Sequence, residues 1–364
     1  MRIQVTRAVV STSALLLAVG GLAACGDDEG DSGSSSSTSG STGASGKIGL
    51  LLPESKTARY ESKDRPLFEA KVKELCPDCE IVYANADQDA AKQQQQAESA
   101  LTSGVKVLVV DPVDSAAAAS IVTSAKAQNV PVIAYDRFIN GAPADYYISF
   151  DNEKVGVLQG TAIVDKIKAD GTEAKGILMV NGSPTDNNAT LFKKGAHSII
   201  DASGIKVLAE YDTPDWSPDK AQEWVAGQLT QHKDLAGIYA ANDGTGGGSI
   251  AALKAENVSP IPPVTGQDAE LAGIQRIVAG DQYMTIYKAI KAEAEKAAEL
   301  AVGLLRGEKP AGDTQVEGIE SFLLPPVAVT IENLKDSVIA DGFLTVSEIC
   351  TADYVDACTK AGIS

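Results

Sequence analysis

The chain has 364 residues, of which 44% are hydrophobic and 22% charged, a composition typical of a soluble globular protein with room for two cores. Its formal net charge at pH 7 is −18. Nucleic acids and anionic membrane surfaces bind basic proteins, so this charge argues against both as partners.

Residues 1–24 have the features of a secretory signal. A basic start at Arg2 and Arg7 precedes an apolar run that is too short to span a membrane comfortably. The run ends in Leu-Ala-Ala before Cys25, like the bacterial lipoprotein cleavage box, so we expect Cys25 to carry a lipid; an ordinary signal peptide is the alternative. After Cys25, residues 26–46 contain no apolar side chain larger than alanine, so residues 25–46 are predicted to form a flexible tether. The sequence therefore predicts an extracytoplasmic protein, anchored by lipid to the outer face of the cell membrane.

The other four cysteines form two local pairs, Cys76 with Cys79 and Cys350 with Cys358. Outside the cytoplasm an even set of cysteines predicts disulfides, although the sequence alone does not exclude cross-pairing. A redox-active Cys76–Cys79 pair is the alternative. It is less favoured because Cys76 closes a predicted helix, whereas a helix N-terminus is what lowers a thiol pKa.

From Lys47 onward, apolar runs alternate with helical patterns. Runs that are apolar on both faces and separated by helices indicate a parallel sheet covered on both sides, as in a doubly wound α/β domain. The predicted strands of this first part are 48–52, 81–83, 105–110 and 130–135, and the predicted helices are 59–75, 90–103 and 115–128.

The same pattern then restarts, which predicts a second lobe of the same class. The predicted strands are 176–180, 206–211, 237–240 and 263–265, and the predicted helices are 152–167, 186–200, 219–232, 245–255 and 269–278. A long helix over 288–305 and a strand over 327–331 follow, and we expect them to return to the first lobe and cross again.

The fold class expected is therefore α/β, with two doubly wound parallel-sheet lobes joined by a multi-strand hinge. The predicted divisions are 47–149 with 286–325 for the N-terminal lobe, 150–285 with 326–349 for the C-terminal lobe, and 350–364 for a tail with a local disulfide.

Polar residues follow nearly all of these strands, at the carboxyl ends where open α/β sheets bind ligands. Asp136 and Arg137 come directly after an apolar run, and strand neighbours point to opposite faces, so the two cannot simply pair with each other. We expect them at a sheet edge that faces a cleft. The candidates collected in this way mix carboxylates, cations and amides: Arg59, Asp136, Arg137, Asn187 or Asn188, Asn242, Asp268 and Lys288.

Catalysis, metal binding and phosphate binding find little support. The Gly-rich stretch after Asn242 has no lysine and does not match a phosphate-binding loop. His197 and His232 fall in predicted helices away from strand ends, so we expect no metal site, and no cofactor is implied. Asp136 and Asp268 could be proposed as a glycosidase pair, but each has a candidate cation or amide nearby. The protein is predicted not to be an enzyme.

This mixed set suits an uncharged polyol. Each sugar hydroxyl both donates and accepts, and a hydrogen bond to a charged group contributes roughly 1.5–3 kcal/mol. The apolar faces of a sugar also favour flat aromatic rings, for which Trp216 and Tyr60 are the candidates. The alternatives are an interface-packing role for Trp216, an inter-domain ion pair for Asp136 and Arg137, and a solvated helix start for Lys288.

Several motifs of the chain resemble those of the periplasmic D-xylose-binding proteins of ABC sugar importers, which have the type I periplasmic binding protein fold. The similarity extends from about Lys47 to about Leu324. The motifs are YDRFIN, YISFDNEKVG, GSPTDNNATLF, ANDGTGGG, GQDAELAGIQRI and MTIYK. The resemblance implies that two lobes close around one monosaccharide and that the closed form docks on a permease.

The resemblance also assigns residue roles. Tyr60 stands where the family commonly has tryptophan, so the choice of sugar could differ. The residues that match the family's sugar-binding positions are Arg59, Asp136, Arg137, Asn188, Trp216, Asn242, Asp268 and Lys288.

The leading hypothesis is a lipid-anchored, monomeric binding protein that delivers a monosaccharide, D-xylose first, to an ABC permease. The alternatives are a binder of glucose, galactose or arabinose, a sensor that presents sugar to a membrane receptor, and a glycoside-processing enzyme. A sugar-responsive repressor shares this fold but needs an N-terminal DNA-binding helix pair, and this chain has a signal and a tether there.

Overall fold

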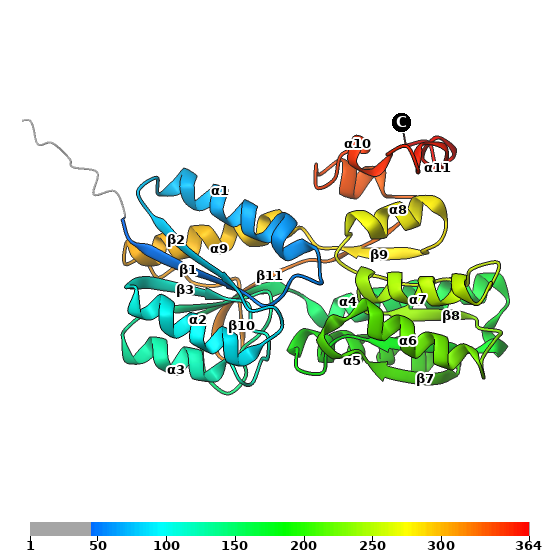
Figure 1. Ribbon diagram of the computed structural model, residues 1–364, viewed down its shortest axis with the longest axis horizontal. Coiled ribbons are helices and arrows are strands. Elements are labelled where there is room, and N and C mark those ends of the chain that lie inside the picture. Colours follow the sequence, from blue (N-terminus) through cyan, green and yellow to red (C-terminus); the bar gives the residue numbers. More distant parts are fainter. Residues whose placement is uncertain (1–44, 364) are drawn as a thin grey trace, which may run out of the picture. The chain divides into compact units, whose positions relative to one another are not determined.

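The predicted apolar runs of the first part lie side by side in one seven-stranded sheet (Figure 1). The computed structural model describes residues 45–363, so the predicted signal, the lipidation at Cys25 and most of the tether lie outside the described residues. The strand order is β10-β11-β5-β4-β3-β1-β2, and every pair is parallel except the β10–β11 hairpin. The strands are β1 (Lys47–Leu52), β2 (Glu80–Asn85), β3 (Val105–Val110), β4 (Val132–Tyr135), β5 (Tyr146–Phe150), β10 (Thr314–Val316) and β11 (Ile319–Leu324).

Helices cover both faces of this sheet, which explains its continuous apolar strands (Figure 1). On β3, Val107 and Val109 pack toward α1 and α9, whereas Leu108 and Val110 pack toward α2 and α3. Both sets are buried, so these four positions do not alternate between apolar and polar residues as they would in a strand with one face in water. The helices are η1 (Tyr60–Asp64), α1 (Arg65–Leu75), α2 (Ala90–Thr102), α3 (Ala119–Ala127) and α9 (Ile290–Leu305).

The second part of the chain forms a three-stranded parallel sheet in the order β7-β6-β8. The helices α4 and α5 pack on one of its faces, and α6 and α7 on the other. The elements are α4 (Asn152–Asp170), η2 (Glu173–Lys175), β6 (Ile177–Asn181), α5 (Asn187–Ser203), β7 (Val207–Asp212), η3 (Pro214–Trp216), α6 (Pro218–Leu229), β8 (Gly237–Ala240), α7 (Asp243–Ala255) and α8 (Leu271–Ala279).

One predicted strand and several predicted helix ends were wrong; the helix predicted from Ser115, for example, begins at Ala119. The range 263–265 forms no strand, and Val264 makes only an isolated bridge to Ile238. Prolines precede Val264, and proline has no N–H to donate to a neighbouring strand. The helix predicted over 219–232 ends at Leu229, so His232 lies beyond it. The helix predicted from Lys288 begins at Ile290, which leaves Lys288 on the segment that enters it.

The chain passes between the two larger sheets several times. It leaves the seven-stranded sheet after β5, returns through α9, and leaves again after β11. There, β12 (Val327–Thr330) pairs antiparallel with β9 (Met284–Tyr287) instead of joining either larger sheet. The described residues cluster as one compact unit, and the lobe boundaries given above remain a prediction.

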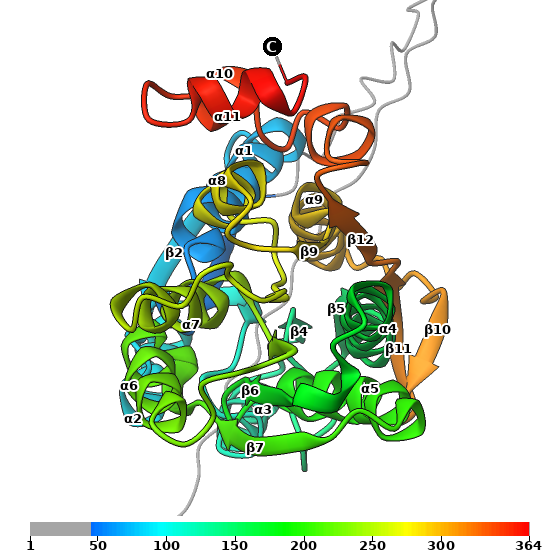
Figure 2. The ribbon, with the colours of Figure 1, turned by 90° about the vertical axis from the view of Figure 1, so that its right-hand side faces the viewer.

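The last residues of the chain pack against α8 rather than extending from the fold (Figures 1 and 2). They form η4 (Lys335–Ile339), α10 (Val346–Ile349) and α11 (Val355–Lys360). The predicted local disulfides are both present, with sulfur–sulfur distances of 1.97 Å for Cys76–Cys79 and 2.05 Å for Cys350–Cys358.

Close packing of α4 on α5 depends on two glycines. A Cβ on Gly156 would lie 1.9 Å from the carbonyl oxygen of Phe192, and one on Gly195 would lie 2.1 Å from that of Glu153. We therefore expect Gly156→Ala to lower the free energy of unfolding by about 3 kcal/mol, measured by urea denaturation, because the two helix backbones must move apart.

Gly227 is the matched control, since it lies exposed on α6 and a Cβ added there would meet no heavy atom within 4 Å. Gly227→Ala should raise stability by about 0.4–1 kcal/mol through the unfolded state. Equal effects of the two substitutions would contradict the packing described for α4 and α5.

Candidate functional site

A small cavity lies among side chains at the carboxyl ends of strands from both larger sheets. Its volume is about 20 Å³, room for one water-sized molecule, so a larger ligand enters only if its walls move apart. Eight of the nine predicted site residues line it, and the ninth, Arg59, lies behind Asp136. The lining residues are Thr57, Tyr60, Asp136, Arg137, Asp186, Asn188, Phe192, Trp216, Asn242, Gln267, Asp268 and Lys288.

Asp136 turns out of the sheet immediately after β4. Its φ is +56°, in the left-handed region that side chains rarely adopt, at a cost of about 1–3 kcal/mol. Its N–H donates to Ile148 of β5 (2.8 Å), and its carbonyl accepts from Ser149 Oγ (2.5 Å) and Asn188 Nδ2 (2.9 Å). These bonds hold the backbone turn that points the carboxylate into the cavity.

Three side chains hold the carboxylate of Asp136. Oδ1 accepts from Arg59 Nη1 at 3.2 Å and lies 3.7 Å from Lys288 Nζ, and Oδ2 accepts from the Tyr60 hydroxyl at 3.0 Å. Burial alone would raise the pKa of this carboxyl. The charges of Arg59, Lys288 and Arg137 outweigh burial, so the pKa of Asp136 lies well below its usual value and the group is ionised.

Arg59 is itself held from behind by two carboxylates that the sequence analysis missed. Asp64 accepts from its Nε (2.9 Å) and Nη2 (2.6 Å), and Glu293 of α9 accepts from Nη2 (2.6 Å). All three residues are almost fully buried. Burial lowers the pKa of Arg59, but the charges of Asp136, Asp64 and Glu293 outweigh it and raise that pKa well above its usual value.

Arg137 joins the two sheets through Asp186, another residue that the sequence analysis missed. Its Nε lies 3.0 Å from Asp186 Oδ2 and 3.5 Å from Asp111 Oδ1, and its Nη2 donates to the Tyr60 hydroxyl at 3.1 Å. Asp186 also caps α5, since its Oδ1 accepts from the N–H of Asn188 at 2.8 Å. Asp136 and Arg137 thus each pair with side chains from other elements.

Trp216 is fixed beside the cavity by three contacts. Its Nε1–H donates to Asp186 Oδ2 at 3.0 Å, and its ring meets the edge of Phe192 with centroids 6.3 Å apart. A Cβ on Gly182 would lie 2.0 Å from the Trp216 ring, so the ring rests directly on the backbone after β6. The indole is buried and also lines the cavity, so it packs as one interpretation expected, and its stacking against a sugar stays a prediction.

Asp268 and Lys288 form an ion pair that lines the cavity. Lys288 Nζ lies 3.0 Å from Asp268 Oδ1, and the lysine is only 2% exposed, so its interpretation as a solvated helix start was wrong. Burial lowers the pKa of Lys288, but the charges of Asp268 and Asp136 raise it by more than burial lowers it. The pKa therefore lies above its usual value, and the amine stays charged. Asp268 has φ of +91°, the second site carboxylate in the left-handed region.

Asn242 reaches the cavity from the start of α7, where its side chain caps the helix by accepting from Thr245 N–H at 2.8 Å. The next residue, Asp243, is fully buried and accepts from Gln282, Thr285 and the N–H of Glu270. The network around Asp243 therefore fixes the starts of α7 and α8 relative to β9.

The residues that the sequence analysis missed are of two kinds. Thr57, Asp186, Phe192 and Gln267 line the cavity itself; Gln267 stands at a predicted strand end, and Asp186 precedes Asn188 within a quoted motif. Asp64 and Glu293 lie behind Arg59, where only the folded structure reveals them, whereas Asp111, which lies near Arg137, directly follows the predicted strand 105–110.

Two carboxyls that face one cavity have pKa values shifted in opposite directions, a feature that a glycosidase would need. Burial raises the pKa of Asp186, whereas that of Asp136 is lowered. However, Asp186 Oδ1 accepts from the Asn188 N–H and Oδ2 from the Trp216 Nε1–H. Neither oxygen of Asp186 is therefore placed to donate a proton to a ligand. Among residues 45–363, no group of His, Cys, Asp and Glu has the arrangement needed to hold a metal ion.

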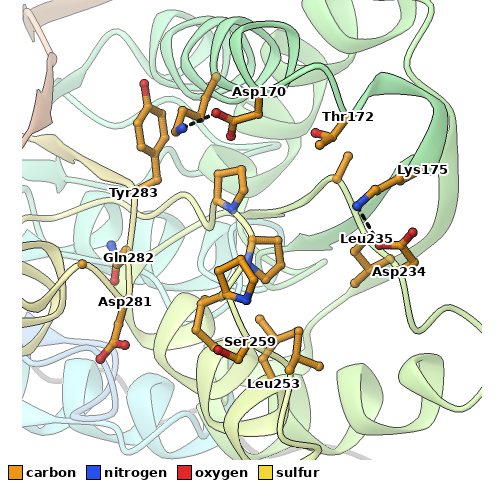
Figure 3. A pocket seen from close by; sticks show the side chains of 18 of the residues that line it. Asp170, Thr172, Lys175, Asp234, Leu235, Leu253, Ser259, Asp281, Gln282 and Tyr283 are labelled. Carbon is orange, nitrogen blue, oxygen red and sulfur yellow. Dashed lines mark hydrogen bonds and ion pairs between the residues drawn. The ribbon is translucent and has the colours of Figure 1, made fainter.

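A larger cavity of about 880 Å³ lies elsewhere, near the amino ends of β6 and β8 (Figure 3). Tyr283, Leu253 and a proline-rich loop line it, and its ion pairs, such as Lys175–Asp234 at 2.8 Å, already satisfy each other. None of the predicted site residues contributes to it. Convergent polar groups, rather than size, therefore mark the candidate site.

Comparison with known proteins identifies the family. Residues 48–309 match the family described as Periplasmic binding protein domain. The chain belongs to this family. The D-xylose-binding periplasmic protein of Escherichia coli (strain K12) is 39% identical to this family member over 312 residues, which cover 83% of the chain and 92% of the relative.

Further relatives of this binding protein differ in the sugar that they are named for. The multiple sugar-binding periplasmic receptor ChvE of Rhizobium radiobacter is 31% identical over 327 residues, with 83% of this chain and 92% of the relative covered. A solved structure, an ABC transporter solute binding protein from Clostridium phytofermentans with bound β-D-glucose, is 27% identical, with a TM-score of 0.76 over 83% of this chain and 99% of that chain.

These comparisons confirm the predicted type I periplasmic binding protein fold. The relatives reported are solute-binding proteins rather than enzymes. Within residues 45–363, no helix combines the length and the apolar character that crossing a membrane requires.

The carboxyls around α7 and α8 predict how stability depends on pH. Burial raises the pKa of Asp243 to about 7, and burial with the charges of Asp243 and Asp268 raises that of Glu270 to about 8. Unfolded carboxyls titrate near pH 4, so between roughly pH 4 and 8 the folded chain holds protons that the unfolded chain releases. The free energy of unfolding should therefore fall as pH rises from about 6 to 8.5, by up to about 1.4 kcal/mol per pH unit for each proton.

Urea denaturation of the wild-type chain and of Asp243→Asn across this range checks the assignment. The variant should lose much of the slope, because its side chain does not titrate. His197, whose pKa is raised by Glu210 and Asp201 against the effect of burial, acts with the same sign, so His197→Gln is the control. A wild-type stability that rises over this range would contradict the account of Asp243.

Proposed function

We propose that this chain binds one monosaccharide in the cavity around Asp136 and delivers it to an ABC permease, with D-xylose as the first choice of sugar. The observation that carries the proposal is that carboxylates, cations, amides and a flat indole all line one cavity. Every sugar hydroxyl can both donate to a carboxylate and accept from a cation or amide, which neither a phosphate nor an apolar ligand requires.

The choice of D-xylose rests on the relatives, whereas Tyr60, which stands where the family commonly has tryptophan, is the feature that argues for a different sugar. The E. coli relative with 39% identity is named for D-xylose, whereas the ChvE relative is named for several sugars, so glucose, galactose and arabinose remain the alternative ligands. Tyr60 brings a hydroxyl that already bonds Asp136 and Arg137, which reduces what those two groups offer to a ligand. A thermal-shift panel of pentoses and hexoses should identify the sugar.

Binding is proposed to occur by closure of two lobes, divided as the sequence analysis gives them. Side chains from the seven-stranded sheet and from the second part of the chain meet around the cavity, and the cavity is smaller than a sugar ring. A sugar must therefore enter while the walls stand apart, and the three connections between the sheets are the candidate hinge.

The protein is proposed to act outside the cytoplasm as a monomer, tethered through residues 25–46 and a lipid on Cys25. Its two disulfides agree with an oxidising compartment. An enzymatic role on glycosides is the alternative, and incubation with aryl xylosides separates the two: a binding protein releases no aryl alcohol at steady state.

Removing one charged side chain from the cavity should weaken sugar binding. Arg137→Ala and Asp268→Ala should each cost at least about 2 kcal/mol of binding free energy, because their buried partners are left unpaired. Isothermal titration calorimetry with D-xylose measures the loss, after a thermal melt has shown that each variant is folded.

Arg65→Ala is the control. It removes a guanidinium that is 38% exposed on α1 and pairs only at the surface with Glu61 and Glu69, so the affinity should change by less than about 0.3 kcal/mol. Wild-type affinity in both cavity variants would rule out this site.

A further inference from the structure

The C-terminal segment, residues 331–363, touches the elements next to Arg59 and Lys288, two of the three cations of the candidate site. Phe343 of this segment lies between Tyr287, the last residue of β9, and Lys63 of η1. The Tyr287 and Phe343 ring centroids are 5.2 Å apart. Lys63 Nζ donates to the Phe343 carbonyl oxygen at 2.7 Å and lies 5.0 Å from the centroid of the Phe343 ring.

Each of these neighbours is close in sequence to a site residue. Tyr287 directly precedes Lys288, and its hydroxyl also donates to Asp341 of the C-terminal segment. Lys63 lies in η1, which directly follows Arg59 and contains Tyr60. Phe343 therefore contacts, from outside the cavity, the segments that carry Arg59 and Lys288.

Arg59, from behind the cavity, and Lys288, from its lining, share the same carboxylate oxygens. Arg59 Nη1 and Lys288 Nζ lie 3.2 and 3.7 Å from Asp136 Oδ1, and 3.7 and 3.0 Å from Asp268 Oδ1. Like charges this close repel each other, and the repulsion is strong where water is excluded. The shared geometry survives only if the segments behind Arg59 and Lys288 cannot move apart.

The C-terminal segment has a rigid base that allows Phe343 to restrain them. Leu334, Val338 and Ile349 are fully buried in one cluster with Ile274 of α8, and Gln275 Nε2 donates to the Ile349 carbonyl at 3.3 Å. The Cys350–Cys358 disulfide closes the segment on itself. Figures 1 and 2 both show its helices beside α8, which begins three residues after Asp268.

We propose that Phe343 is a positioning residue for the candidate sugar site: it holds η1 and the end of β9 at the separation that lets Arg59 and Lys288 share Asp136 and Asp268. The inference rests on the proposed function, because it concerns the affinity of that same cavity. Phe343 itself does not line the cavity and acts only through Lys63 and Tyr287.

Phe343→Ala in the full chain tests the proposal in two independent measurements. The dissociation constant for D-xylose should rise at least 10-fold by calorimetry at 25 °C. In the sugar-free chain, deuterium exchange of the backbone amides of 59–64 and 284–290 should accelerate at least 10-fold, because both segments lose their restraint. Phe343→Leu, which keeps an apolar side chain between them, should stay within about threefold of wild type in both measurements.

Leu253→Ala is the matched control for general loss of stability. Leu253 is more deeply buried than Phe343 but lies at the remote cavity of Figure 3, so its truncation should lower the melting temperature without changing the affinity by more than about threefold. The proposal is overturned if Phe343→Ala keeps wild-type exchange in 59–64 and 284–290, or binds D-xylose within threefold of wild type.

The two measurements separate this proposal from the proposed function. If the wild-type chain binds no monosaccharide, the proposed function fails, and the exchange rates of 59–64 and 284–290 alone decide whether Phe343 restrains those segments. If the wild-type chain binds D-xylose and Phe343→Ala does so equally well, the site stands and the role of Phe343 is refuted.

Discussion

A buried carboxylate is tolerated only when opposite charges and hydrogen bonds replace the water that it lost, and Asp136 is the residue on which this constraint falls most heavily. Arg59, Lys288 and Tyr60 supply that replacement: Arg59 and Tyr60 come from the start of η1, and Lys288 from the segment after β9. The requirement to neutralise one side chain thus brings η1, β4 and the segment after β9 to a single point. Removing one partner of such a buried set typically lowers the stability of the fold by about 3–5 kcal/mol, so these charges also hold the elements together.

The same groups are suited to a ligand that has hydroxyls and no charge. Because each cation at the cavity is already paired with carboxylates, an added ligand need not bring charge of its own. Asp186 contacts both the indole of Trp216 and the guanidinium of Arg137, so one carboxylate fixes a polar and an aromatic side chain of the cavity. Membership of the periplasmic binding protein family agrees with this chemistry, since relatives are named for sugars.

Much of this could be predicted from the sequence, because the physical rules involved are local. A strand such as β3 that is buried on both faces must be apolar over its buried length, here Val107–Val110, and site residues follow the strands that position them. Interactions between distant segments could not be predicted in this way. Strand β5 was missed because it contains Ser149, a polar residue that is buried only because it bonds Asp136. Glu293 was missed because its alanine- and lysine-rich helix looks solvent-exposed until Arg59 is placed against it.

A crystal structure of the chain grown with D-xylose tests the central claim most directly. The account predicts one sugar ring against Trp216, with its hydroxyls within hydrogen-bond distance of Asp136, Arg137 and Asp268. A cavity without sugar at saturating D-xylose, or sugar bound only in the larger cavity beside Tyr283, would contradict it.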